Sequence, residues 1–393
     1  MEGNENINTN AEDNLKEVVQ TDQTIPSIPK PLKKKKKGVI RWLIRSWLGT
    51  IFFIYLFSVL FRWLVIEAYT IPSPSMEGTL MTGDFILVSK FHYGARTFST
   101  PLHIPLTHQK IWGTNTPSYV DWSPFPITRF PLGKVKQNDL VVFNYPLDFK
   151  HPIELKTPYI KRCVAVAGDT LEIKQAKVFV NSQEIKNIPQ KQFHYYVSTD
   201  YEISDLFFQK YGIREYSSMK LERGVGYHVY TTPAKIKYFK KLSFFNKATI
   251  IPLIEGLRNP NIFPKNKEFA WNEDNFGALI VPAKGMSLPM TRLNVLLYGN
   301  LIKNFEIYGG RQHVEIKGED LLINGSKVNE YTFQQDYFFM LGDNFHNSVD
   351  SRFWGLVPKD HIIGKAFFIW LSLDQQKNWF DGKIRWNRVG TVR

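Results

Sequence analysis

Apolar residues along this chain form one long run and several short ones. The long run extends from Trp47 to Ile66, and Arg62 is its only charged residue. A helix of about twenty residues would extend about 30 Å, the thickness of a bilayer core. An arginine near the end of such a helix can direct its long side chain towards the interface. The pattern therefore predicts one transmembrane helix over residues 46–67.

The residues before this run predict its orientation. Residues 1–29 are polar and acidic, which predicts a disordered tail. A basic cluster follows and consists of Lys30, Lys33, Lys34, Lys35, Lys36, Lys37, Arg41 and Arg45. Positive charge before an apolar helix places residues 1–45 in the cytoplasm and the chain after the helix outside. A cleaved secretory signal is the alternative, but the run is too long and no small-x-small site lies within residues 67–72.

The short apolar runs predict strands rather than further membrane spans. They cover residues 84–90, 140–143, 159–166 and 366–371. The segments 172–182 and 315–325 are similar to each other and predict two hairpins, and Asn324-Gly325 is typical of a type I′ turn. We therefore expect a mainly β fold. Its main β domain would comprise residues 68–184 and 313–393, with a mostly β subdomain inserted at residues 185–312.

Residues 97–134 are rich in proline and aromatic residues and predict a long surface loop. Two positions for its aromatic side chains are open. They would either contact the membrane interface or pack on their own domain.

Composition and charge narrow the class of protein. The 393 residues are 22% charged and 43% hydrophobic, which is typical of globular domains. A formal net charge of +14 raises nucleic acid as a partner, but much of this charge lies in the basic cluster before the apolar run. Because no RNA- or DNA-binding motif is present, we expect no nucleic-acid partner. Cys163 is the only cysteine, so no intramolecular disulfide can form.

The segment that follows the apolar run carries two serines in a restricted turn. Ser73 lies between Pro72 and Pro74, and Ser75 lies between Pro74 and Gly78. Proline fixes its own φ and restricts the residue before it, so a serine in this turn is held in place, as a nucleophile must be. A linker turn after a membrane anchor is the simpler interpretation of this segment taken alone.

Lys161 changes that interpretation. It lies in the apolar strand predicted over residues 159–166, where alternation places it on one face with Cys163. Burial lowers the pKa of an amine, and a neutral amine can accept the proton of a serine hydroxyl. Ser75 and Lys161 are therefore a candidate catalytic dyad. A lysine that faces solvent from an edge strand is the alternative.

Other catalytic patterns have less support. Ser217 and Lys220 have the S-x-x-K spacing of penicillin-binding enzymes, but the accompanying Lys-Thr-Gly and Ser-Asp-Asn motifs are missing. The motifs G-x-S-x-G, H-E-x-x-H and paired C-x-x-C are also missing. His346 could complete a Ser-His-Asp triad, although nothing else supports it. Cys163 is more simply a small core residue than a nucleophile.

Three separated segments together resemble type I signal peptidase, the membrane-bound bacterial leader peptidase. The first runs from Ile71-Pro-Ser-Pro-Ser-Met76 to Gly83-Asp84, and the second comprises Tyr159-Ile-Lys-Arg162 with Gly168-Asp169. The third runs from Gly342-Asp-Asn to Trp354-Gly355. Their order and spacing match that family, and the resemblance covers about residues 40–185 and 313–375.

The resemblance implies an activity and a location. It implies a serine endopeptidase that removes N-terminal signal peptides from exported preproteins after small-x-small sites. Such an enzyme uses no cofactor and no metal and works as a monomer. It would sit in the bacterial cytoplasmic membrane, held in the lipid bilayer by a single span with its catalytic domain outside.

The resemblance also implies a role for each matching residue. Ser75 would be the nucleophile and Lys161 the general base, with the Ser73 hydroxyl and the Ser75 backbone N–H as the oxyanion hole. Ser348 would orient the Lys161 amine. Asp350 and Arg352 would form a supporting salt bridge, and Asp343 would be a further supporting residue. An extended substrate would place its small side chains in shallow apolar subsites lined by Tyr69, Ile71, Pro72, Met76, Leu80, Val142, Tyr159 and Ile160.

The sequence departs from the family pattern at three positions. Phe345-His346 stands where Arg-Asp is common after Gly-Asp-Asn, and Pro74 replaces a usual glycine between the two serines. Two other classes of protein remain open. A self-cleaving repressor-type protease shares the Ser/Lys core but would be soluble and carry a DNA-binding module. An inactive relative would serve as a membrane-anchored scaffold.

Overall fold

The computed structural model describes residues 36–392, apart from residues 98–99, 101–102, 105–106, 108, 121, 123–127, 131, 187–189, 251 and 308–312. The chain divides into two compact units, Met1–Ser58 and Val59–Arg393. The predicted disordered tail, residues 1–29, lies outside the described residues.

The first long element is helix α2, Lys36–Leu64. It covers most of the apolar run, and its large apolar side chains are exposed, among them Trp47, Phe52, Phe53 and Phe57. In the part of the chain that the structure describes, no helix combines the length and the apolar character needed to cross a membrane.

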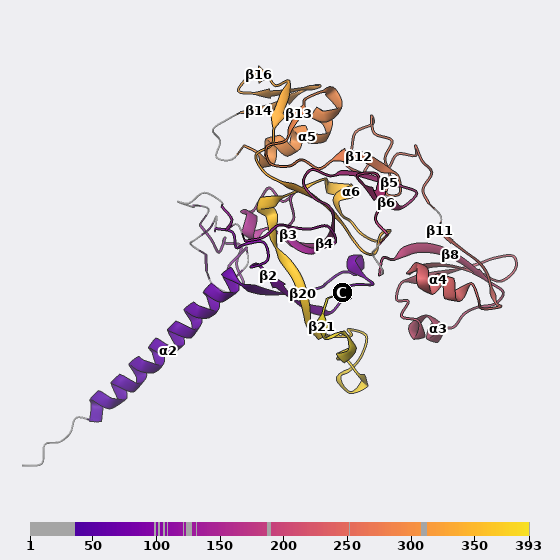
Figure 1. The fold of residues 1–393 in the computed structure, drawn as a ribbon. Coiled ribbons are helices and arrows are strands. Elements are labelled where there is room, and N and C mark those ends of the chain that lie inside the picture. Colours follow the sequence, from indigo (N-terminus) through magenta and orange to yellow (C-terminus); the bar gives the residue numbers. More distant parts are fainter. Residues whose placement is uncertain are drawn as a thin grey trace, which may run out of the picture. The chain divides into compact units, whose positions relative to one another are not determined.

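An eight-stranded antiparallel sheet forms the centre of the second unit (Figure 1). Its strand order is β1-β2-β20-β3-β4-β18-β19, and β21 pairs with β20. The strands are β1 (Ile66–Thr70), β2 (Asp84–Ser89), β3 (Leu140–Asn144), β4 (Pro158–Ala165), β18 (Tyr337–Leu341), β19 (Val357–Pro358), β20 (Ile362–Ser372) and β21 (Gly390–Thr391). All four strands predicted from apolar runs are present in this sheet.

Alternation along the central strands buries both faces of the sheet. On β3, Leu140 and Val142 belong to one apolar cluster, and Val141 and Phe143 belong to another. The first cluster contains the apolar residues next to Ser75, whereas the second contains Cys163. A strand that is covered on both faces reads as a continuous apolar run, which is why residues 140–143 show no polar alternation.

A second core packs small sheets against a helix. It contains a sheet of order β12-β5-β6-β7, a pair β13-β17, a sheet β14-β15-β16, and α5 (Arg292–Phe305). The strands are β5 (Thr170–Lys174), β6 (Lys177–Val180), β7 (Gln183–Glu184), β12 (Phe276–Ile280), β13 (Ser287–Pro289), β14 (Val314–Lys317), β15 (Asp320–Ile323), β16 (Ser326–Lys327) and β17 (Glu330–Thr332). Both predicted hairpins are confirmed, as β5–β6 and β14–β15. Asn324 and Gly325 both have positive φ and connect β15 to β16, as a type I′ turn requires.

Residues 193–250 build a third, smaller core. Strands β8 (Phe193–Thr199), β9 (Tyr216–Lys220), β10 (Val225–Thr231) and β11 (Phe245–Ile250) form a sheet of order β11-β8-β10-β9. Helices α3 (Asp205–Lys210) and α4 (Pro233–Phe239) contribute Phe208, Ile236 and Phe239 to the core on this sheet (Figure 1). We call residues 193–250 the inserted sheet.

The rest of the predicted insertion is interwoven with its flanking segments. Strand β12 pairs with β5, which precedes the insertion, and β13 pairs with β17, which follows it. The mainly β fold is therefore confirmed, while the predicted boundaries at residues 185 and 312 stay a prediction.

The described part of the predicted surface loop contains isolated bridges rather than regular strands, such as Arg96 with Arg129 and His103 with Tyr119. Trp112, Trp122 and Phe130 in it are more than half exposed. Whether these side chains contact a membrane stays a prediction.

Candidate active site

Ser75 lies on a short 3-10 helix, η1 (Pro74–Met76), in the connection between β1 and β2. Ser73 is extended, with φ −133° and ψ 156°, as expected for a residue that precedes proline. The next side chain, Met76, is buried, and the Leu80 N–H donates to the Met76 carbonyl at 2.8 Å. Ser73 is exposed and Ser75 is half-buried. The turn is therefore anchored from below, while its hydroxyls remain accessible.

Lys161 approaches Ser75 from the adjoining sheet. Strand β4 carries it opposite Val141 of β3, and its side chain is almost fully buried. Its Nζ lies 2.6 Å from Ser75 Oγ and 3.0 Å from the Ile160 carbonyl oxygen. Burial lowers the pKa of Lys161 to about 8, although the nearby carboxylates of Asp350 and Asp343 raise it. The arrangement supplies an amine that can lose its proton near neutral pH and a hydroxyl within hydrogen-bond distance.

Asp343 connects the serine segment to the lysine strand. Its side chain is buried and accepts two hydrogen bonds from Arg162, at 2.7 Å from Nε and 2.6 Å from Nη2. The same carboxylate accepts from Thr79 Oγ1 at 2.5 Å. Thr79 belongs to the segment that carries Ser75, and Arg162 follows Lys161 on β4. One carboxylate therefore contacts both sides of the serine–lysine pair.

Asp350 and Arg352 form a fully buried ion pair. Arg352 donates to Asp350 from Nε at 2.9 Å and from Nη2 at 2.7 Å, and neither side chain is exposed. Arg352 also donates to the carbonyl of Phe345 at 2.5 Å, and Asp350 accepts from the N–H of Gly342 at 3.1 Å. The ion pair fixes the two ends of the loop between Gly342 and Arg352.

Two other predicted residues have different surroundings. Ser73 Oγ lies 3.3 Å from Ser75 Oγ, so its hydroxyl is beside the candidate nucleophile. Ser348 Oγ is buried and has no hydrogen-bond partner among the described residues. The hydrogen bond that the resemblance implies between Ser348 and the Lys161 amine is therefore not formed in this structure. Ser348 Oγ instead lies against Gly342, where an added Cβ would be only 2.1 Å away.

The sequence matches a protein family that combines these segments. A family model described as "Signal peptidase, peptidase S26" matches residues 44–221 and 330–371, which is more than half of the chain. The chain belongs to this signal peptidase family. It is therefore a serine endopeptidase, and the family resemblance noted from the three sequence segments is confirmed.

Individual relatives align along most of their length. Signal peptidase I of Buchnera aphidicola subsp. Schizaphis graminum is 28% identical over 93% of this chain and 85% of the relative. Signal peptidase I of Aquifex aeolicus is 27% identical, covering 81% of this chain and 82% of the relative. Signal peptidase I of Pseudomonas aeruginosa is 24% identical, covering 88% and 78% respectively.

Most of the residues predicted to line the subsites gather beside Ser75. Ile71, Met76, Leu80 and Val142 belong to one buried cluster, and Tyr69 and Ile160 pack against it. Pro72 is exposed next to this cluster in sequence. Tyr159 packs against Tyr145 and Trp354 in the other core of the central sheet, and its ring centroid lies 5.9 Å from Lys161 Nζ. Their role in binding substrate stays a prediction.

Phe345 and His346, which depart from the family pattern, both contact other residues of the fold. Phe345 is buried, and its ring lies 4.1 Å from the Arg352 guanidinium. His346 Nε2 lies 2.7 Å from Asp274, and its Nδ1 accepts the backbone N–H of His194 at 3.1 Å. Because both ring nitrogens of His346 are engaged in this way, a Ser75-His346-Asp triad has no support in the structure.

Cys163 lies in the core. Its thiol is fully buried, and this burial raises its pKa well above the ordinary value. A buried, protonated thiol is a poor nucleophile, which agrees with the interpretation of Cys163 as a small core residue.

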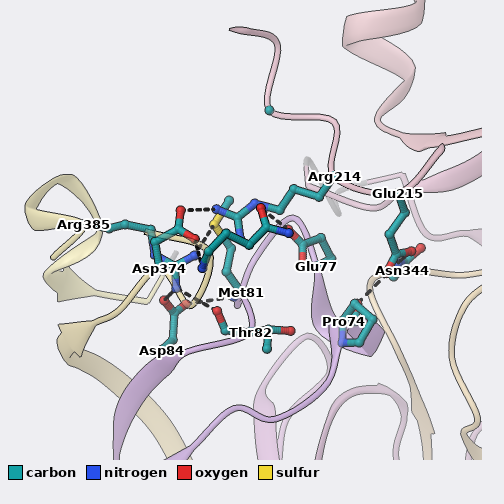
Figure 2. Close-up of polar contacts among 12 residues, drawn as sticks. Pro74, Glu77, Met81, Thr82, Asp84, Arg214, Glu215, Asn344, Asp374 and Arg385 are labelled. Atoms are coloured by element: carbon teal, nitrogen blue, oxygen red, sulfur yellow. Dashed lines mark hydrogen bonds and ion pairs between the residues drawn. The ribbon is translucent and has the colours of Figure 1, made fainter. Parts of the chain in front are cut away.

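Sequence reasoning missed several residues that hold the site. Asn344 donates its backbone N–H to the Ser75 carbonyl at 3.2 Å and its side-chain amide to the Pro74 carbonyl at 3.3 Å. Arg214 and Glu215, just before β9, lie near Glu77 and Asn344 (Figure 2). Asn344 belongs to the Gly342-Asp-Asn motif, so the sequence did indicate that this residue lies near the site. Nothing in the sequence around residues 214–215 indicates a contact with the serine turn.

Proposed function

We propose that this protein removes N-terminal signal peptides from exported preproteins by means of a Ser75–Lys161 dyad. The observation that carries the proposal is the 2.6 Å distance between Lys161 Nζ and Ser75 Oγ, formed between a buried amine and an accessible hydroxyl. Family membership supplies the reaction class, since the relatives named above are all called signal peptidase I.

The geometry supports a defined order of steps. The neutral Lys161 amine takes the proton of Ser75 Oγ as that oxygen attacks the scissile carbonyl. Negative charge develops on the carbonyl oxygen, and the Ser73 hydroxyl and the Ser75 backbone N–H would stabilise it there. The Lys161 ammonium then gives its proton to the departing amine, which leaves an ester on Ser75. A water molecule, activated by Lys161 in the same way, hydrolyses this ester and releases the enzyme.

Substrate selection follows from the cluster beside Ser75. We propose that Tyr69, Ile71, Pro72, Met76, Leu80, Val142, Tyr159 and Ile160 line shallow apolar subsites. Because several of them are already buried against one another, such subsites leave room for small side chains only. This agrees with the small-x-small rule for signal-peptide cleavage.

We also propose that residues 46–67 anchor the protein in the bacterial cytoplasmic membrane. The support is the series of large apolar side chains that α2 exposes, together with the basic cluster before it. Residues 1–45 would then be cytoplasmic, and the parts at 68–184, 185–312 and 313–393 would lie outside. The protein would work as a monomer. Extraction of membranes at alkaline pH tests the anchor: the full chain should stay in the pellet, whereas a variant lacking residues 46–67 should be released.

Cleavage of a peptide with an Ala-x-Ala site, by the full chain in detergent micelles, tests the dyad. The wild type should cut after the second Ala, whereas Ser75→Ala and Lys161→Ala should not cut. Because the proposed base works when its amine is neutral, kcat/KM should rise with pH through the Lys161 pKa of about 8. A flat profile between pH 6 and 9 would count against an amine base, and cleavage by Ser75→Ala would exclude Ser75 as the nucleophile. If the wild type is inert, the scaffold interpretation takes its place.

A further inference from the structure

Two adjacent residues of the inserted sheet contact the segments around Ser75: Arg214 contacts the turn that carries Ser75, and Glu215 contacts the loop at residues 344–347. Arg214 and Glu215 lie between α3 and β9 and point towards Glu77 and Asn344 respectively (Figure 2). They are fixed in place from behind. Ile213 is buried, and its N–H donates to the Phe208 carbonyl at 2.8 Å. The Glu215 carbonyl accepts the Tyr230 N–H at 3.1 Å.

Glu215 holds the loop that follows Asp343. Its Oε2 accepts from Asn347 Nδ2 at 2.6 Å and lies 3.5 Å from Asn344 Nδ2. Asn344 in turn donates to the carbonyls of Pro74 and Ser75. A continuous series of hydrogen bonds therefore leads from the Glu215 carboxylate to the backbone of the residue that carries the candidate nucleophile.

Arg214 acts on the other side of the turn. Its Nε lies 3.8 Å from Glu77 Oε1, and its Nη2 lies 3.5 Å from Asp374 Oδ2. Glu77 is two residues after Ser75 and is buried, and this burial raises its pKa while Arg214 lowers it. A buried carboxylate needs a compensating cation, and Arg214 supplies one from the inserted sheet.

We propose that Arg214 and Glu215 are positioning residues of the peptidase, which fix the Ser75 turn and the loop at residues 344–347 from the inserted sheet. This inference rests on the proposed Ser75–Lys161 function. Among the described residues, Arg214 contacts Glu77 and Glu215 contacts Asn344 and Asn347, so both act on Ser75 through these neighbours. The proposal gives the inserted sheet a task in catalysis rather than in substrate capture alone.

Substitution of Glu215 separates positioning from binding. In Glu215→Ala the amides of Asn344 and Asn347 lose their common acceptor, and the Ser75 turn can shift relative to Lys161. Because misplacement of a reacting group by about 1 Å can cost about 10²-fold, we expect kcat to fall by about 10- to 100-fold with KM nearly unchanged. Glu215→Gln keeps an amide oxygen that accepts from Asn347, so it should recover most of the lost kcat.

Arg214→Ala should lower kcat in the same direction but by less, about threefold, because its ion pairs are long and partly exposed. Glu222→Ala and Arg223→Ala are matched controls, since both residues are exposed in the turn between β9 and β10 of the same sheet. Both controls should keep wild-type kcat. Thermal unfolding of each variant shows whether its fold is retained.

The outcomes distinguish this inference from the proposed function. If the wild type cuts the Ala-x-Ala peptide and Ser75→Ala does not, but Glu215→Ala has the same kcat as Glu222→Ala, only the positioning inference is overturned. It is also overturned if Glu215→Gln is as impaired as Glu215→Ala and both unfold at lower temperature, because that result indicates a purely structural role. If the wild type leaves the peptide intact, the proposed function fails, and this inference fails with it.

Discussion

Replacing Lys161 with methionine should stabilise the folded protein while it abolishes cleavage. Burial lowers the Lys161 pKa from 10.5 to about 8, so an ammonium at this position is less favourable in the folded than in the unfolded chain. This difference corresponds to about 3 kcal/mol of stability lost at pH 7. The substitution also removes the donor of two hydrogen bonds, to the Ile160 carbonyl and to Ser75 Oγ, which together offset about 2 kcal/mol. Lys161→Met should therefore be about 1 kcal/mol more stable than the wild type at pH 7.

The size of this difference should change with pH. Between pH 8 and 10.5 the unfolded chain binds more protons at Lys161 than the folded chain does, so the stability of the wild type rises with pH relative to the variant. The advantage of Lys161→Met should shrink from pH 8 upwards and be lost as pH approaches 10.5.

Denaturant unfolding in micelles, followed by tryptophan fluorescence at pH values from 7 to 10, measures this difference. Lys303→Met is a matched control for the loss of a lysine, because Lys303 is exposed on α5 whereas Lys161 is buried. If the difference between the wild type and Lys161→Met is the same at pH 7 and pH 10, burial does not lower the pKa of this lysine. The base proposed for the mechanism would then lose its physical justification.

Three further substitutions test the surroundings of the site. Asp350→Asn leaves the Arg352 guanidinium buried without its counter-charge and should lower the free energy of unfolding by about 3–5 kcal/mol. The surface control Asp320→Asn should lower it by at most about 1 kcal/mol. Equal denaturation midpoints for the two variants would contradict this. Gly342→Ala should be inactive, because its Cβ would lie 2.5 Å from the Ser75 carbonyl oxygen, and normal cleavage rates would show that the loop can yield. Ser73→Ala should lower kcat by about 10²–10³-fold if its hydroxyl serves the oxyanion, whereas Ser73→Thr should retain part of the activity.

Much of the central sheet could be predicted from the sequence because its strands are buried on both faces. Residues 140–143 form a continuous apolar run, and residues 159–166 form an apolar run that only Lys161 and Arg162 interrupt. Runs of that kind and length are typical of such strands. The Asn324-Gly325 turn could be predicted because it needs two adjacent residues that tolerate positive φ. Both patterns depend only on residues that are neighbours in the sequence, so they predict structure without knowledge of contacts between distant segments.

Contacts between distant segments could be predicted only where a family motif linked them. Ser75 and Lys161 are a candidate dyad from amine chemistry alone, and the resemblance of their segments to the motifs of one family makes that pairing specific; their side chains do meet at 2.6 Å. The hydrogen bond expected from Ser348 to Lys161 is not formed, since a motif assigns a residue to a site but not its side-chain rotamer. The contacts of Glu215 with Asn344 and Asn347 join residues 129 and 132 positions apart, and no local pattern encodes such a pairing.

Around Ser75, apolar contacts determine how deeply the segment is buried, and polar contacts determine its orientation. Met76 and Leu80 are buried in the cluster beneath the turn, and apolar contact of this kind sets the depth of a segment but has little directionality. Hydrogen bonds depend on angle as well as distance, so the polar contacts of Asp343 set the orientation. Because Asp343 binds both Thr79 and Arg162, a shift of the serine segment relative to the lysine strand must stretch at least one of these bonds. Asp343 thus restrains the Ser75–Lys161 distance through Thr79 and Arg162, the neighbours of these two residues, so Asp343→Asn should impair kcat more than KM.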